Sequence, residues 1–407
     1  MSSISTGTTT TTGYVVASDT TGTLVLKTGA SATTAVTIDT SQNATFAKTA
    51  NLPNTFGFKN RIINGAMVIS QGAAGASVTP LISATYAANY AVDRFITDVS
   101  QTSKITVEQN AGSVTPPVGF SKYLGITVGA AANVSVGASD YFILSQKIEG
   151  NNIADLAWGT ANAQTVTLSF WVRSSVTGTF GGCIRNGASN RSYPFTYTVS
   201  SSNTWTQISV SIPGDTTGTW STDNTTGMFV FFSLGSGSTY SGTASAWAAA
   251  QYVTATGVTN PITTNSATFY ITGVQLEVGT VATSFDYRSI GTETSLCQRY
   301  FWKTLPNLYA RFGLVDCLST TGADCVMPFP VQMRTTPSLS TTGTAGNYAI
   351  YTRQTLNAVS ALSLDTVGTT ALTGVVSCAS TGLVAGSSGQ LVAFATTAAF
   401  LSFSAEL

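Results

Sequence analysis

The chain contains no histidine among its 407 residues. Histidine is the most frequent general base in enzymes and a common ligand of zinc and copper. Its absence also excludes the serine–histidine and cysteine–histidine pairs that activate nucleophiles. The sequence therefore favours a binding or structural protein over an enzyme.

Charged residues are scarce as well, at 8% of the chain, against about 25% in a typical soluble domain. The 17 basic and 17 acidic residues cancel, so the formal net charge is zero. Nucleic-acid backbones and anionic membranes both attract basic surfaces. We therefore expect no nucleic-acid partner and no polybasic attachment to a membrane.

The five cysteines are odd in number and form no CxxC pair, which is typical of neither a zinc site nor a complete disulfide set. We expect small buried thiols in a protein that assembles in a reducing compartment, with no cofactor or metal. The cysteines are Cys183, Cys297, Cys317, Cys325 and Cys378.

No stretch approaches the roughly 18 consecutive apolar residues of a membrane helix, and the first residues lack the basic and apolar regions of a signal peptide. We expect synthesis in the cytoplasm without a signal peptide. Hydrophobic residues make up 43% of the chain and aromatic residues 10%, a composition that predicts folding rather than disorder.

Short apolar or alternating runs separated by Gly, Ser and Thr turns predict an all-β protein. In the middle of the chain such runs occupy Tyr141–Ile148, Thr165–Val172 and Met228–Phe232. The last of them is apolar throughout, which suits a strand covered on both faces. We divide the chain into residues 1–57, 58–290 and 291–407.

Two separated stretches are the most informative, Asn60–Gln71 (NRIINGAMVISQ) and Ala267–Gly279 (ATFYITGVQLEVG). Each is predicted as a β-strand. In the second, Phe269 and Ile271 lie on one face of the strand. Val274, Leu276 and Val278 have the opposite parity, so a regular strand would place them on the other face, and the strand needs a bulge. Gly273 lies at this skip, and glycine tolerates the positive φ that a bulge requires.

Together with Ser169–Ser174, Asn203–Ile208, Ser284–Arg288 and Leu296–Phe301, these stretches resemble bacteriophage tail-fibre proteins that carry a jelly-roll module similar to carbohydrate-binding modules. The resemblance implies a central jelly-roll-like β-sandwich over residues 58–290. Carbohydrate-binding modules of this kind often hold calcium through acidic residues in the first and last strands. Here Asn64 and Ile271–Val274 lack those acids, so we expect no metal.

Residues 291–407 are predicted to form a small β-sandwich at the tip, with strands at Leu308–Leu318, Cys325–Met333 and Tyr348–Arg353 among others. Leu401, Phe403 and Ala405 alternate, which indicates that the end of the chain is held in a sheet.

Residues 1–57 contain only short β-like bursts, at Tyr14–Val16, Leu24–Leu26, Ala35–Ile38 and Thr45–Phe46. So few residues cannot bury a core alone, which favours intertwining with identical chains. The resemblance to phage fibres implies that this segment forms a homotrimer and attaches to other virion proteins. A flexible tether is the alternative.

Glycan binding needs flat aromatic faces beside polar groups. The candidate ligand-binding residues are Trp220, Tyr240, Trp247, Tyr252, Tyr348 and Tyr351. Trp171 has the opposite parity to the core residues of its strand, so we expect it to face outward.

Paired carboxylates of a glycosidase are a competing interpretation, with Asp215 and Asp223 around one loop and Asp316 and Asp324 around another. Such aspartates are usually turn residues. We assign no catalytic residue. Among the charged residues, Arg173 is expected to pair with Glu149 or Asp155 as part of local structure.

The sequence thus predicts a phage virion fibre subunit that recognises host-surface glycan by multivalent, non-catalytic binding. The alternatives are a purely structural fibre or spike that decorates the capsid, and a polysaccharide depolymerase. A purely structural fibre would retain no glycan, which distinguishes the first alternative. A depolymerase would release reducing ends from host polysaccharide, which distinguishes the second.

Overall fold

A computed structural model describes residues 24–28, 33–38, 40, 44–46, 59–83, 85–305, 307–352, 355–368, 371–394 and 396–407. The chain splits into two compact units, Met1–Gly57 and Phe58–Leu407. In the first, β1 (Leu24–Thr28), β2 (Thr33–Ile38) and β3 (Ala44–Phe46) form a three-stranded antiparallel sheet. The strand expected at residues 14–16 lies outside the described residues. None of the helices in the described ranges has the length and apolar content needed to cross a bilayer.

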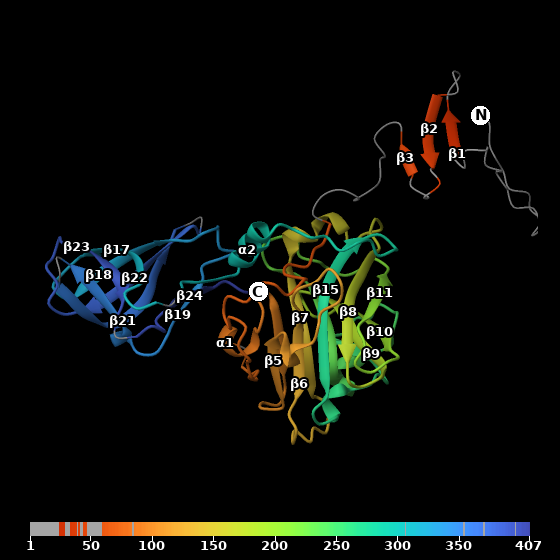
Figure 1. Cartoon of the computed structure of the whole chain (residues 1–407), viewed down its shortest axis with the longest axis horizontal. Coiled ribbons are helices and arrows are strands. Elements are labelled where there is room, and N and C mark those ends of the chain that lie inside the picture. Colours follow the sequence, from red (N-terminus) through yellow and green to blue (C-terminus); the bar gives the residue numbers. More distant parts are fainter. Residues whose placement is uncertain are drawn as a thin grey trace, which may run out of the picture. The chain divides into compact units, whose positions relative to one another are not determined.

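The second unit begins with a β-sandwich of two five-stranded antiparallel sheets, drawn from orange to green in Figure 1. One sheet has the order β10-β9-β12-β7-β4, and the other has the order β11-β8-β15-β6-β5. The strands are β4 (Phe95–Val99), β5 (Ile105–Gln109), β6 (Leu124–Val128), β7 (Tyr141–Glu149), β8 (Val166–Ser174), β9 (Gly178–Asn186), β10 (Ser192–Val199), β11 (Thr206–Ile212), β12 (Thr226–Ser236) and β15 (Thr268–Val278). This is the all-β, jelly-roll-like arrangement that the sequence predicts.

Short elements connect these strands. They are α1 (Tyr86–Asn89), the 3₁₀ turns Ala111–Ser113, Gly150–Asn152, Ala154–Leu156, Ser238–Tyr240 and Pro261–Thr263, and the two-residue strands β13 (Ser241–Gly242) and β14 (Thr254–Ala255).

The sandwich core follows from strand alternation. Phe142 and Leu144 of β7 and Leu168 and Phe170 of β8 are fully or almost fully buried, and they belong to one hydrophobic cluster between the sheets. Side chains of a strand point alternately to its two faces, so the intervening residues face away from this core. Trp171 is one of them and is partly exposed, as predicted.

The predicted bulge in β15 is confirmed. The register with β8 shifts between Thr272 and Gln275, and Gly273 has φ of +63°. Because of this shift, Ile271 before the bulge and Val274 after it both enter the sandwich core. One continuous strand therefore contributes to the same core on both sides of the bulge.

The prediction of a strand at residues 60–71 is wrong, since the segment consists of bends and a turn. Asn64 and Met67 have φ near +60°, which lies outside the β region that residues other than glycine adopt in a regular strand. The Asn64 side chain also donates to the carbonyl of Ile69 and accepts from its amide (2.8 and 2.9 Å). Local bonds from asparagine to the backbone compete with strand pairing, and here they prevail.

The segment nevertheless lies along β15. The amide of Arg61 donates to the carbonyl of Leu276, and the amide of Val274 donates to the carbonyl of Gly65 (3.0 Å each). The side chain of Asn60 adds two hydrogen bonds: it donates to the carbonyl of Val274 and accepts from the amide of Leu276 (3.0 Å each). The two bookends of the sandwich are thus neighbours, although only one is a strand.

After the sandwich come α2 (Ile290–Gln298) and a C-terminal all-β part, drawn in blue in Figure 1. Six of its strands close into a barrel in the order β17-β18-β22-β21-β20-β23, and three form a sheet in the order β16-β24-β19. The strands are β16 (Phe301–Lys303), β17 (Arg311–Cys317), β18 (Gly322–Pro328), β19 (Ser338–Thr341), β20 (Tyr348–Thr352), β21 (Thr355–Val367), β22 (Thr373–Ser380), β23 (Ser388–Ala393) and β24 (Leu401–Ser404), with a 3₁₀ turn at Ala345–Asn347. The sequence indicates the strands but not the closure of the barrel.

The end of the described chain is held in this three-stranded sheet, as the alternation of Leu401 and Phe403 predicts. β24 is the central strand, and the amide of Thr304 donates to the carbonyl of Leu401 (2.9 Å). The chain therefore leaves the three-stranded sheet after Thr304 and returns to β24 at Leu401, directly beside the point where it left.

Buried ionic contacts join the sandwich to the C-terminal part. Glu149 at the end of β7 accepts from Arg299 (2.6 and 3.0 Å) and from the Tyr300 hydroxyl (2.7 Å). Arg94 pairs with Glu406, and its guanidinium lies 3.5 Å from the centre of the Tyr300 ring. Such a cluster fixes geometry because breaking one partner leaves an unpaired buried charge.

The expected pairing of Arg173 with Glu149 or Asp155 is wrong. Arg173 lies on the outer face of β8, where it donates to the carbonyl of Asn203 (3.0 Å) and lies over the Tyr270 ring. Glu149 belongs to the opposite sheet, and Asp155 binds Arg61 instead. All five cysteines are buried, which confirms the expectation of small core thiols.

Candidate functional site

The outer face of the β10-β9-β12-β7-β4 sheet carries a recess of about 300 Å³. We call it the sheet-face recess. Strand parity explains it, since β7 and β12 send alternate side chains into the core and onto this face. It is lined by Asp98, Tyr141, Ile143, Lys147, Arg185, Phe229, Phe231, Tyr240 and Val253.

The register of three strands aligns the main groups of the recess. Lys147 of β7 pairs with Phe229 of β12, which pairs with Arg185 of β9 on its other side. In the row two residues further along β12, Phe231 pairs with Ser145 and Cys183. A cationic row thus lies beside a largely apolar row on one face of the sheet.

Aromatic rings and cations form layers in the recess. The rings of Phe229 and Phe231 are nearly parallel, with centres 5.3 Å apart and an angle of 9°. The guanidinium of Arg185 lies 4.7 Å from each centre, a cation–π contact that holds its plane in place. Tyr141 and Tyr240 meet edge to face at 5.5 Å beside this layer.

The charged groups of the recess are partly desolvated. Burial raises the pKa of the Asp98 carboxyl, and the nearby charges of Lys147 and Arg185 oppose this only in part. Burial likewise lowers the pKa of Lys147 and of Arg185. Shifts of this kind gather at functional sites because charges there are kept from water for a ligand.

Two polar atoms on this face have no hydrogen-bond partner in the described part of the chain. They are the Arg185 Nε and the hydroxyl of Ser145, and both are buried. Buried polar atoms are almost always paired. Two such exceptions beside aromatic rings make this face a candidate site for a polar ligand.

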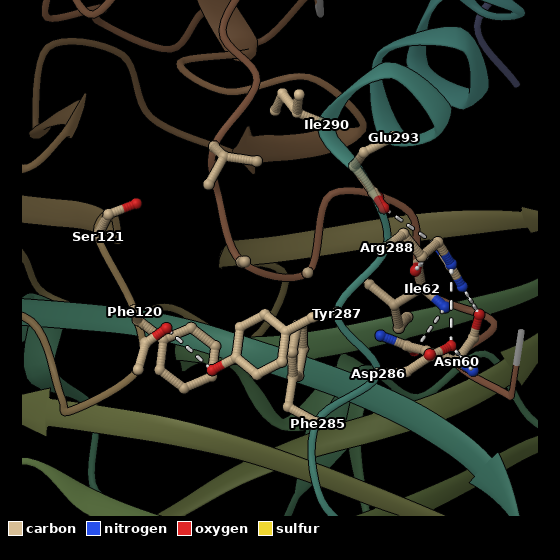
Figure 2. Close-up of a pocket in the computed structure, with 14 residues that line it drawn as sticks. Asn60, Ile62, Phe120, Ser121, Phe285, Asp286, Tyr287, Arg288, Ile290 and Glu293 are labelled. Atoms are coloured by element: carbon tan, nitrogen blue, oxygen red, sulfur yellow. Dashed lines mark hydrogen bonds and ion pairs between the residues drawn. The ribbon is translucent and has the colours of Figure 1, made fainter.

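A second recess, of about 210 Å³, lies between loops at the other sheet (Figure 2). We call it the loop recess. Phe120, Phe285 and Tyr287 form an aromatic cluster on one side of it, with ring centres 4.9 to 5.6 Å apart. Tyr287 also donates to the carbonyl of Gly119 (2.9 Å).

The charged groups of the loop recess hold the backbone of residues 60–64. Asp286 accepts from the amide of Asn60 (3.2 Å), and Arg288 donates to the carbonyl of Ile62 (3.1 Å). Glu293 accepts from the amide of Asn64, and Figure 2 shows these side chains turned toward that segment. Because these groups are engaged in structure, the loop recess is the weaker candidate for a ligand.

The predicted ligand-binding residues in the middle of the chain divide into two groups. Tyr240 and Tyr252 pack beside the sheet-face recess, and Tyr240 lines it. Trp220 and Trp247 instead join Trp158 in an edge-to-face cluster on the sandwich core. Trp220 is only 8% exposed and so offers no ring face to a ligand.

In the C-terminal part, Tyr348 is completely buried and donates to the carbonyl of Phe400 (2.5 Å). Its ring supports the barrel core rather than a surface. Tyr351, three residues later on the same strand, is partly exposed and lines a recess on the barrel.

Three of the four carboxylates considered as glycosidase groups, Asp215, Asp223 and Asp324, have structural partners. Asp215 is buried and binds Arg191 (2.5 and 2.9 Å) and the Trp220 indole (3.1 Å), while Asp223 receives bonds from Thr225. Asp324 is bonded by the Ser377 hydroxyl (2.7 Å). In the described ranges no three acidic or cysteine side chains gather where a metal could bind.

Sequence reasoning missed Tyr141, Arg185, Phe229 and Phe231. One signal for the two phenylalanines was present, because the apolar run of β12 indicates that both faces of this strand are covered. The run does not reveal that the outer cover is incomplete, since that depends on β9 and on residues 238–255.

No family model matches the chain, and no curated protein matches it. Solved structures with local likeness include a candidate sugar-binding protein from Bacteroides thetaiotaomicron, at 11% identity and a TM-score of 0.31, covering 54% of this chain and all of that one. A family 11 carbohydrate-binding module from Clostridium thermocellum matches at 10% identity and a TM-score of 0.24, covering 47% of this chain and 91% of that one. The CBM22-1 xylan-binding domain from Paenibacillus barcinonensis matches at 10% identity and a TM-score of 0.23, covering 46% and 87%.

Proposed function

We propose that this chain is a non-catalytic glycan-binding protein, a fibre subunit of a bacteriophage virion that attaches to sugar on the host surface. The observation that carries the proposal is the sheet-face recess, where aromatic rings lie beside a buried arginine Nε with no partner. Aromatic faces pack against the C–H groups of a sugar ring, and charged and amide groups bond its hydroxyls.

The composition of the recess supports binding rather than cleavage. Asp98 is the only carboxylate in its lining, whereas glycosidases use two carboxylates on either side of the scissile bond. A single half-buried acid between two cations can accept hydrogen bonds from hydroxyls. It has no second acid to act with.

The virion assignment is supported by the sequence motifs that resemble phage fibres. The small three-stranded sheet of the first unit supports a homotrimer, because so few residues bury little apolar surface without partner chains. In a trimer three weak sites act together, and tethered sites bind at a high effective concentration.

The proposal is tested by measuring glycan binding with the full chain and with Tyr240→Ala and Arg185→Gln. Each variant removes one polar or aromatic contact of the recess, so we expect retained glycans to bind at least about tenfold more weakly, which is about 1.4 kcal/mol. Tyr287→Ala in the loop recess, where the ring is 59% exposed, is the matched control and should bind normally.

The same proteins are added to a phage adsorption assay, in which the unaltered chain should compete with adsorption and the two recess variants should not. If the unaltered chain retains no glycan and leaves adsorption unchanged, the proposal fails.

A further inference from the structure

The C-terminal barrel has a recess of its own on its outer wall, of about 220 Å³. We call it the barrel recess. It is lined by Tyr309, Arg311, Tyr351, Leu356 and Val392. Register brings the last four together, since Arg311 of β17 pairs with Val392 of β23 and Tyr351 of β20 pairs with Leu356 of β21, and β20 and β23 are adjacent in the barrel.

The charge of the barrel recess is positive and uncompensated. Arg311 is exposed, its side chain has no hydrogen bond or ion pair with any residue that the structure describes, and no acidic residue lines the recess. By contrast, Arg94, Arg191 and Arg299 each bind a carboxylate. Arg173, Arg185 and Arg334 bind no carboxylate in the described ranges either, but each donates to a backbone carbonyl, whereas the Arg311 side chain has no such bond there.

The backbone presents an aromatic ring at the rim of this recess. Tyr309 has φ of +58°, a left-handed conformation that costs a residue other than glycine about 1 kcal/mol. The turn is held by bonds from the Tyr309 amide to Ala393 (3.2 Å) and from the Ala310 amide to Asn307 (3.1 Å). As a result a large ring stands 55% exposed.

The size of the recess limits its ligand. Pockets for drug-sized molecules measure about 300–1,000 Å³, so this smaller recess suits a single ring. Two tyrosines supply flat faces and hydroxyls, Leu356 and Val392 supply an apolar floor, and Arg311 supplies the fork geometry that carboxylates and phosphates fit.

We propose that the barrel recess is a second ligand site, which takes one anionic sugar residue whose carboxylate or phosphate pairs with Arg311 while its ring lies against Tyr309 or Tyr351. The barrel recess is distinct from the proposed glycan site of the sandwich, because it lies on the C-terminal barrel and favours negatively charged sugars. The two sites would give each subunit two unlike contacts with one surface.

The test titrates the full chain with glucuronic acid, glucose 6-phosphate and glucose, and monitors binding by ligand-observed NMR. Because an arginine–anion pair is charge-assisted, we expect at least one of the two anions to bind about tenfold or more tightly than glucose. Tight binding of the first alone identifies a carboxylated sugar, and tight binding of the second alone identifies a phosphorylated one.

Arg311→Gln and Tyr351→Ala should abolish this preference, while Tyr240→Ala in the sheet-face recess should keep it. Melting temperatures of the variants confirm that they are folded. Equal binding of glucose and both anions, or a preference that survives Arg311→Gln, overturns the inference. Loss of the preference in Tyr240→Ala alone also overturns it, since the anion would then lie on the sandwich. If Tyr240→Ala retains glycan as well as the unaltered chain does, only the proposal for the sheet-face recess fails. The proposal for the barrel recess is therefore tested separately.

Discussion

The side chain of Asn60 makes hydrogen bonds to the backbone of β15 that a neighbouring strand would otherwise make. Its side-chain oxygen accepts from the amides of Ile62 (2.9 Å) and Leu276 (3.0 Å), and its nitrogen donates to the carbonyl of Val274 (3.0 Å). The apolar residues that follow Asn60 favour a strand, but a sequence pattern indicates burial and not the hydrogen-bond partner of each amide. The expectation of a strand at residues 60–71 is wrong for this reason.

At the residue scale we predict that Asn60→Ala lowers the free energy of unfolding by about 2–3 kcal/mol, since three buried backbone groups lose their partner. The control is Asn265→Ala, which removes two exposed bonds to Asn133 and should cost less than about 1 kcal/mol. Chemical denaturation of the 58–407 fragment and of the full chain measures both. Equal losses for the two variants would mean that Asn60 does not support β15.

At the scale of elements, parity within one strand predicts local geometry well. The bulge at Gly273 follows from the sequence because Phe269 and Val274 both need the core. Barrel closure does not follow, because it depends on β17 pairing with β23, more than 70 residues away. The candidate site is similarly divided: Tyr240 can be proposed from its polar loop, whereas Arg185 and Phe229 meet only through the pairing of β9 with β12.

The bulge gives a prediction for glycine replacement. Gly273→Ala should lower the free energy of unfolding by about 2 kcal/mol, half from its positive φ and half from steric conflict, because an added Cβ would lie 2.7 Å from the Phe120 ring. Gly257 has φ of +79° and no atom within 4 Å of an added Cβ, so Gly257→Ala isolates the conformational cost of about 1 kcal/mol. Thermal unfolding of both variants measures the difference. A loss for Gly257→Ala that matches or exceeds that of Gly273→Ala would contradict the steric argument.

At the scale of the whole molecule, the second unit depends on ionic contacts between residues far apart in the chain. Burial alone would raise the pKa of Glu149, but the bonds from Arg299 and Tyr300 outweigh burial and place it below its ordinary value of 4.5. A carboxyl with a lowered folded-state pKa stabilises the fold above its unfolded-state pKa and loses this contribution as the pH falls through the folded-state pKa. The contact between the sandwich and the C-terminal part should therefore weaken in acid, below about pH 4.5.

We predict that Glu149→Gln is about 2 kcal/mol less stable than the unaltered chain at pH 7 and that the two stability curves converge as the pH falls toward 3. Thermal unfolding from pH 7 to pH 3 measures this. Asp155→Asn, which breaks the exposed pair with Arg61, should cost less than about 1 kcal/mol. Parallel curves for Glu149→Gln and the unaltered chain would show that Glu149 contributes nothing to acid sensitivity.

The three hydrogen bonds between Thr304 and Leu401 have a consequence for diversification. Since these two residues are adjacent, residues 305–400 form a cassette. Its replacement removes β19 and the bonds between Arg334 and Asn224, but it leaves the pairing of β16 with β24 in place. A different tip inserted between these two residues would inherit an existing attachment, so specificity could be exchanged by recombination at two points without redesigning the remainder of the protein.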